Sequence, residues 1–139
     1  KIVGTPSTNL NFFAVHVYSF GTDVALNKFA SQSTTADWGT SNLGAISAVD
    51  GLMGTFSLTK RNRQPQWWEV DLGSEYPIES MTIMNRYCGN VSDPKECLCR
   101  LSSATIYLID DQNVVIASQY VGDDTCGQQE LSYDFDCAP

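Results

Sequence analysis

The chain has little positive charge and a single histidine. Its 139 residues include eight Lys or Arg against 16 Asp or Glu, and the formal net charge is −8 at pH 7. A surface of this sign repels polyanions, which argues against nucleic acid or an anionic membrane as a partner. No apolar run approaches the roughly 20 residues that a membrane-spanning helix needs. We therefore predict no nucleic-acid partner and no membrane insertion.

Catalytic motifs are missing as well. The histidine, His16, has no serine or cysteine partner in a triad pattern, and the chain has no P-loop, dinucleotide fingerprint or metal-hydrolase motif. His16 alternates with Val15 and Val17, so its side chain points away from the face that buries the valines. The sequence thus predicts a protein that is not an enzyme.

Short segments with strand-like patterns dominate what is present. They cover residues 12–20, 66–72, 78–86, 104–109, 114–121 and 130–135. Clusters of Gly, Pro, Asn, Asp and Ser separate them, and no segment has a sustained helical stripe. With 42% apolar residues, the chain is long enough for a core. This pattern predicts one all-β sandwich or barrel domain over residues 1–139.

Five cysteines in so short a chain favour an oxidising compartment. The sequon at Asn90 predicts N-glycosylation and agrees with a secreted protein. Cys88, Cys97 and Cys99 lie close together in the sequence, and we expect Cys88 to pair with Cys97 or Cys99. The remaining thiol is then open to a bond with another chain. A zinc site is disfavoured by the Cys-x-Cys spacing and by the lack of a nearby histidine.

One stretch carries a family resemblance. It reads Gln-Trp-Trp-Glu-Val-Asp-Leu-Gly over residues 66–73 and Ile-Glu-Ser-Met-Thr-Ile-Met-Asn-Arg over residues 78–86. Alternation at period two predicts two half-buried strands. The pair resembles the core of the F-type lectin branch of the discoidin-like, coagulation factor 5/8 C-terminal-type domains. The resemblance implies a galactose-binding-domain-like jelly-roll β-sandwich that binds sugars, commonly fucose, outside cells.

The pieces that resemble this family stand in a circularly permuted order. The family's opening segment is similar to residues 23–33, whereas its closing pair of strands is similar to residues 1–18. In one interpretation the front strands complete their own sheets, because the termini of such sandwiches lie close together. In another they insert into a neighbour and drive head-to-tail assembly. In a third interpretation, the chain is one segment of a longer tandem array of such domains.

The resemblance also implies a calcium ion. Its ligands would be the carbonyl groups of Ser47, Leu52 and Phe13, the Asp50 carboxylate and the Thr55 hydroxyl. Ala14 stands where the family has a Glu, so the implied site is weak, since calcium affinity rises with ligand charge. In the alternative interpretation, Asp50 and the glycine after it only form an Asx-type turn.

The implied sugar site is a degraded fucose motif. Arg86 and Arg100 fall on its basic positions, but Cys88 replaces its acid, and Leu58 or Thr59 stands at its histidine. Arginine supplies only hydrogen-bond donors, whereas sugar hydroxyls need donors and acceptors.

Neighbouring residues offer further contacts for a sugar. Trp38 and Tyr87 are expected to stack on a sugar face, while Lys60, Arg61 and Arg63 add charge that suits anionic glycans. In the alternative interpretation, Arg86 and Arg100 pair with local acids such as Glu69 or Asp93.

Two further contacts follow from the resemblance. Cys126 and Cys137 match a cysteine pair that flanks a strand in the family, which implies a disulfide between them. Phe13 and Phe56 stand where the family often has another disulfide, so an aromatic contact is expected in its place.

The function predicted from these residues is calcium-supported carbohydrate binding by an extracellular module, with glycans as partners. The rival prediction is a structural building block. It would form homo-oligomers, a filament or a matrix by strand exchange or by an inter-chain disulfide.

Overall fold

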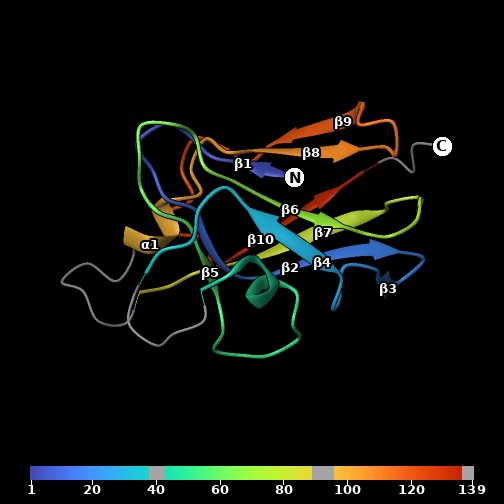
Figure 1. The fold of residues 1–139 in the computed structure, drawn as a ribbon, viewed down its shortest axis with the longest axis horizontal. Helices are drawn as coiled ribbons and strands as arrows, with labels where there is room; N and C mark the ends of the chain where they lie inside the picture. Colours follow the sequence, from blue (N-terminus) through green and yellow to red (C-terminus); the bar gives the residue numbers. More distant parts are fainter. Residues whose placement is uncertain (38–42, 89–95, 136–139) are drawn as a thin grey trace.

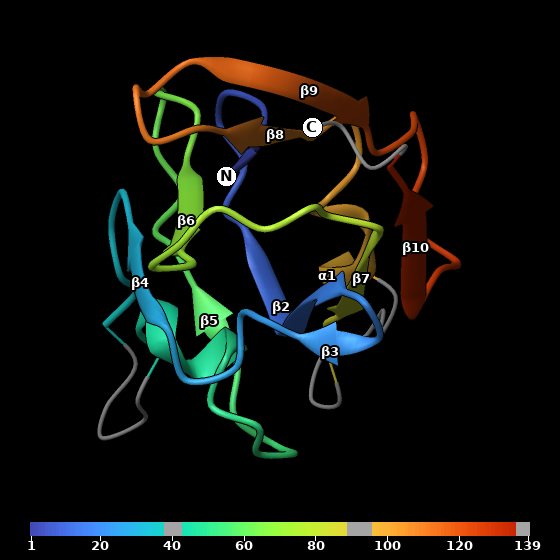
Figure 2. The same ribbon diagram turned by 90° about the vertical axis from the view of Figure 1, so that its right-hand side faces the viewer.

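Two antiparallel β-sheets pack face to face in the computed structural model, which describes residues 1–37, 43–88 and 96–135. Figures 1 and 2 show the sheets, with β8 and β9 at the top of both views. The first sheet has the order β4 (Phe29–Gln32), β6 (Trp67–Asp71), β1 (Ile2–Val3), β8 (Thr105–Ile109) and β9 (Val115–Tyr120). The second has the order β10 (Glu130–Asp134), β7 (Ser80–Asn85), β2 (Asn11–Ser19) and β3 (Thr22–Asp23), and β5 (Ser57–Leu58) also pairs with β2.

Helical structure is limited to two short pieces in these ranges. They are a 3-10 turn at Ala45–Ala48 and the helix α1 at Glu96–Cys99. Neither is of a length that would traverse a lipid bilayer. The predicted all-β sandwich is confirmed.

The core forms where alternating side chains of the two sheets meet. Strand β7 buries Met81, Ile83 and Asn85 and turns the residues between them outward. Strand β2 buries Val15 and Val17 in the same way. Successive side chains of a strand point to opposite faces, so this alternation places one face of each strand in the core. His16 accordingly points away from the core, as predicted.

The two adjacent tryptophans occupy opposite faces of β6. Trp68 is 1% exposed, and its ring meets that of Phe12 edge-on at 5.5 Å between centroids. Its indole N–H donates to the Ala45 carbonyl at 3.0 Å, so the buried polar atom is satisfied. Trp67 is half-buried, with the Lys1 ammonium 4.7 Å from its ring centroid. Trp68 is therefore the core member of the pair.

The front strands lie inside the chain's own sheets. Strand β1 sits between β6 and β8, with Ile2 opposite both Trp68 and Ile106. Strand β2 pairs with β3, β5 and β7. Self-completion is thus the arrangement found, and no second copy is needed to fill either sheet.

A bulge interrupts β2 where it passes β7. Phe12 lies opposite Asn85 and Ala14 lies opposite Met84, so Phe13 is the extra residue. The Phe13 ring meets that of Phe56 edge-on at 6.0 Å. The expected aromatic contact between these two residues is confirmed.

Two disulfides stabilise the loops next to α1. Cys88 bonds to Cys97, one of the two pairings left open by the sequence. Cys99 bonds to Cys126. The implied Cys126–Cys137 disulfide is therefore wrong, and so is the expectation of an unpaired thiol among the three clustered cysteines. Cys137 lies outside the described residues.

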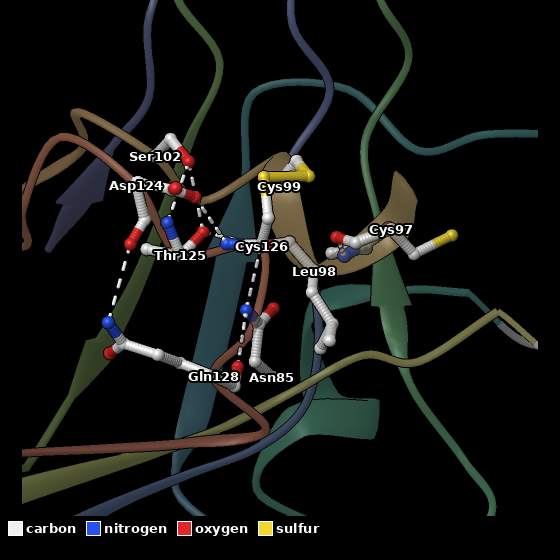
Figure 3. The surroundings of a disulfide bond; sticks show 10 residues. Asn85, Cys97, Leu98, Cys99, Ser102, Asp124, Thr125, Cys126 and Gln128 are labelled. Atoms are coloured by element: carbon white, nitrogen blue, oxygen red, sulfur yellow. Dashed lines mark hydrogen bonds between the residues drawn. A yellow bond between two sulfur atoms is a disulfide. The ribbon is translucent and has the colours of Figure 1, made fainter. Parts of the chain in front are cut away.

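Hydrogen bonds explain why Cys126 lies beside Cys99 (Figure 3). The Asn85 amide nitrogen donates to the carbonyls of Leu98, at 2.9 Å, and Gln128, at 3.1 Å. The Thr125 hydroxyl also donates to the Leu98 carbonyl. These contacts between segments distant in the sequence hold α1 against the turn at residues 124–128. No local sequence pattern encodes that contact.

Candidate functional site

Arg100 is largely buried at the end of α1. Its side chain is 13% exposed, and Nη1 donates to the Asn11 side-chain oxygen at 2.8 Å. Nη2 lies 4.0 Å from the Glu96 carboxylate. The Asn11 amide nitrogen in turn donates to the Cys97 carbonyl at 3.1 Å. These contacts fix the guanidinium between β2 and α1, so the role of the Arg100 side chain is largely structural.

Arg86 directly follows β7 and is held by different contacts. Its guanidinium carbon lies 3.8 Å from the centroid of the Phe56 ring, a cation–π geometry. Its Nη1 lies 3.6 Å from the Cys97 sulfur, and its backbone N–H donates to the Asn85 side-chain oxygen at 2.9 Å.

Arg61, Arg86 and Arg100 form an arginine cluster. Burial lowers the pKa of the Arg86 guanidinium, and the charge of Arg100 lowers it further. Burial also lowers the pKa of Arg100, where Glu96 opposes the shift and Arg61 adds to it. Because arginine stays charged in proteins, the cluster concentrates positive charge on a chain whose net charge is −8.

A hollow beside this cluster has the chemistry of a polar binding pocket. It has a volume of about 470 Å³ and is lined by Asn9, Ala36, Asp37, Thr59, Lys60 and Arg61. We call it the polar pocket. Asp37 offers an acceptor, Lys60 and Arg61 offer donors, and the Asn9 amide offers both. The Asn9 side-chain oxygen is buried and has no hydrogen-bond partner among the described residues.

Backbone contacts fix the walls of the polar pocket. The Thr59 hydroxyl accepts the Leu10 N–H at 2.8 Å, and the Thr59 N–H donates to the Leu10 carbonyl at 3.0 Å. The Lys60 N–H donates to the Thr34 hydroxyl at 2.9 Å. The two bonds between Leu10 and Thr59 continue the β2–β5 pairing into the loops. Figure 1 shows β5 and α1 at the same end of the sandwich.

Sequence reasoning missed the two lining residues of this pocket that carry an amide or a carboxylate. Asn9 and Asp37 stand in loops without a motif, and only the fold brings them together. Asp37 places a carboxylate at the edge of the polar pocket. Tyr87 is 44% exposed and lines a different hollow. Trp38 and Asn90 lie outside the described residues.

Three of the predicted calcium ligands, Ser47, Asp50 and Leu52, lie around a fourth, Thr55. Its hydroxyl oxygen lies 2.8 and 3.0 Å from the two Asp50 carboxylate oxygens. The carbonyls of Ser47 and Leu52 are 3.2 and 3.4 Å from the same atom. Phe13, the bulged residue of β2, lines a hollow together with Asp50 and Leu52.

The loop at residues 47–55 has features of both interpretations of the sequence, the calcium site and the Asx-type turn. Asp50 accepts the Leu52 N–H at 2.9 Å, so an Asx-type turn is present within the oxygen cluster. An all-oxygen donor set suits a hard cation such as Ca²⁺, but it contains one carboxylate. No group of three or more His, Cys, Asp or Glu side chains that could hold a metal ion occurs in the parts of the chain that the structure describes.

The fold and these loops define a domain of the galactose-binding type. Residues 47–138 match the F5/F8 type C family described as the NedA-like, galactose-binding domain. The chain belongs to this family, and the predicted factor 5/8-type relationship is confirmed.

Two similar solved structures are lectin domains. The chain is 28% identical to the lectin domain of lectinolysin complexed with Lewis B antigen, with a TM-score of 0.61, covering 84% of this chain and 79% of that one. It is 27% identical to a histidine mutant of the lectin-binding domain of lectinolysin complexed with Lewis b, with a TM-score of 0.62, covering 86% and 80%. No curated protein matches the chain.

Proposed function

We propose that the chain is an extracellular module that binds carbohydrate in the polar pocket, beside the arginine cluster. The observation that carries this proposal is the set of donors and acceptors around one hollow. The similar lectinolysin domains were solved with Lewis B antigens, which supports the same class of ligand. The two disulfides agree with an extracellular location. The proposed role is binding rather than catalysis.

The pocket chemistry suits sugar hydroxyls, which donate and accept hydrogen bonds at the same time. Asp37 accepts, while Lys60 and Arg61 donate. A volume of about 470 Å³ lies within the usual range for small-molecule sites. Trp38, next to Asp37 in the sequence, stays a predicted stacking residue, whereas Tyr87 lines a different hollow.

Replacing Asp37 with alanine is expected to weaken glycan binding about tenfold, because hydrogen bonds to a charged group contribute about 1.5–3 kcal/mol. Asp37 is exposed, so the substitution leaves the core intact. A glycan array identifies the ligand, and isothermal titration calorimetry then compares the variants.

The matched pair is Arg61→Ala and Arg63→Ala. Arg61 lines the polar pocket, and Arg63, two residues later, does not. We expect a loss of affinity for Arg61→Ala and little change for Arg63→Ala. Equal losses in both, or no glycan bound by the unmodified chain, would contradict the proposed site.

We also propose that calcium supports the loop at residues 47–55. The Asp50 carboxylate, the Thr55 hydroxyl and the carbonyls of Ser47, Leu52 and Phe13 would hold the ion. When bound, it would fix the conformation of this loop next to the β2 bulge. A single carboxylate predicts a weak site, with a dissociation constant of about 1 mM.

Adding 10 mM calcium is expected to raise the melting temperature of the chain by a few degrees. Binding to the folded state at about ten times the dissociation constant stabilises it by about 1.4 kcal/mol. Asp50→Asn should abolish this shift in differential scanning calorimetry.

Asp71→Asn provides the control for this measurement. Asp71 forms an Asx-type turn like that of Asp50, since it accepts the Gly73 N–H at 2.9 Å. The oxygen cluster around Thr55 belongs to the Asp50 turn and not to the Asp71 turn. The calcium response of Asp71→Asn should equal that of the unmodified chain. A chain that calcium does not stabilise would refute the calcium proposal and leave the sugar proposal standing.

A further inference from the structure

A second hollow, of about 510 Å³, lies between the loop at residues 48–54 and the outer face of β2 and β7. We call it the apolar pocket. Its lining includes His16, Leu26, Leu52, Met53, Met84 and Tyr87. It shares no lining residue with the polar pocket. Phe13, Asp50 and Leu52 of the proposed calcium site also line it, but the apolar side chains around it are not explained by a metal ion.

Large apolar side chains stay exposed around this hollow. Met53 is fully exposed, Leu52 is 63% exposed and Leu26 is 45% exposed. Scattered apolar residues are ordinary on a surface, but a group that surrounds a concavity indicates a binding site. The loop that carries Leu52 and Met53 is shaped by two glycines with positive φ, +73° and +97°, at its turns.

One end of the apolar pocket is polar. The Nδ1 atom of His16 lies 2.8 Å from an Asp23 carboxylate oxygen. The other Asp23 oxygen accepts the backbone N–H groups of Val17, at 3.2 Å, and Ala25, at 3.1 Å, which fixes the carboxylate. A carboxylate only accepts hydrogen bonds, so Nδ1 carries the proton, and whenever the ring is neutral Nε2 is the atom that presents a lone pair.

The lone pair of Nε2 is available to a ligand. Within residues 1–37, 43–88 and 96–135, the His16 ring makes its one hydrogen bond through Nδ1. The ring also stacks on that of Tyr18, with 6.1 Å between centroids, so its orientation is fixed. An acceptor of defined direction thus stands at the edge of an apolar hollow.

We propose that the apolar pocket binds a small aromatic molecule that carries one hydrogen-bond donor, such as a phenolic hydroxyl or an indole N–H. The ring lies against Leu26, Leu52 and the two methionines, and its donor bonds to Nε2 of His16. Methionine sulfur makes favourable contacts with aromatic rings, which selects an aromatic body over an alkyl chain. The acceptor at one end selects a ring with a donor.

Nuclear magnetic resonance with methyl-labelled methionine tests this site directly. The chain has three methionines. Met53 and Met84 line the pocket, whereas Met81 is 3% exposed in the core and serves as an internal reference. In a titration with p-cresol at pH 8, we expect the Met53 and Met84 methyl signals and the His16 ring signals to move, and the Met81 signal to stay. His16 is the chain's single histidine, so its signals are unambiguous.

Toluene is the matched ligand control, because it has the ring of p-cresol without the hydroxyl. We expect it to bind about tenfold more weakly, the usual effect of losing one hydrogen bond. His16→Leu should reduce p-cresol binding to the toluene level. Met53→Ser should weaken both ligands, and it cannot disturb the core because Met53 is fully exposed.

Three results would overturn the proposal. They are unchanged Met53 and Met84 signals up to the solubility limit of p-cresol, equal affinities for p-cresol and toluene, and a Met81 shift as large as the other two. If His16→Leu fails to fold, Met53→Ser and the comparison of the two ligands still decide the question.

Discussion

Replacing Trp68 with alanine will lower the free energy of unfolding by about 3–5 kcal/mol, the usual cost of removing a buried tryptophan. The side chain is 1% exposed and lies between the sheets against Phe12. Its removal leaves a cavity and also leaves the Ala45 carbonyl without the indole donor. Because Trp68 also lies opposite Ile2 of β1, we expect the loss to affect the centre of the first sheet.

The adjacent tryptophan supplies the control for this prediction. Trp67 has the same size and lies in the same strand, but its ring is half-buried on the opposite face. We expect Trp67→Ala to cost about 1 kcal/mol, mainly through lost surface contact. Urea unfolding followed by far-UV circular dichroism measures both variants. A cost for Trp67→Ala equal to that for Trp68→Ala would contradict the assignment of Trp68 to the core.

Removing the Cys99–Cys126 disulfide, by alanine at both positions, will cost about 3–4 kcal/mol. The bond joins residues 27 positions apart, and the loss of that cross-link restores conformational entropy to the unfolded chain. It also frees α1, which carries Cys99 and positions Arg100, from the turn at residues 124–128. We therefore expect lower stability together with weaker glycan binding.

The second disulfide provides the comparison. Cys88 and Cys97 are nine positions apart, so loop-closure entropy predicts a loss about 1 kcal/mol smaller when both are replaced by alanine. Chemical unfolding of the two double variants under identical conditions measures the difference. The opposite order would show that packing around the sulfur atoms, rather than the length of the closed loop, sets the contribution of each bond.

The sequence predicted the β-sandwich because its signal is local. In β7, burial alternates along Ser80–Asn85, and that alternation is visible in the residue types themselves. The same holds for Val15, His16 and Val17 in β2. A two-residue period survives in any environment that buries one face of a strand, so no long-range information was needed.

Features that depend on distant segments were not predictable in this way. The bond between Cys99 and Cys126 follows from Asn85, which holds α1 and Gln128 together through two carbonyls. Likewise, Asn9 and Asp37 meet at one pocket only after β2 and β5 have paired. Neither residue belongs to a sequence motif, so the sequence did not predict the hydrogen-bond acceptors that these two residues bring to the candidate sugar site.

The position of β1 has a consequence for synthesis on the ribosome. Ile2 emerges well before its two partners, Trp68 and Ile106. The first sheet therefore cannot close around its middle strand until β8 has left the exit tunnel, and the second must await β10. Until β8 emerges, Ile2 of β1 lacks one of its two partner strands. Folding dominated by such distant pairings is slow and exposed to aggregation, so we expect this chain to depend on chaperones during its production.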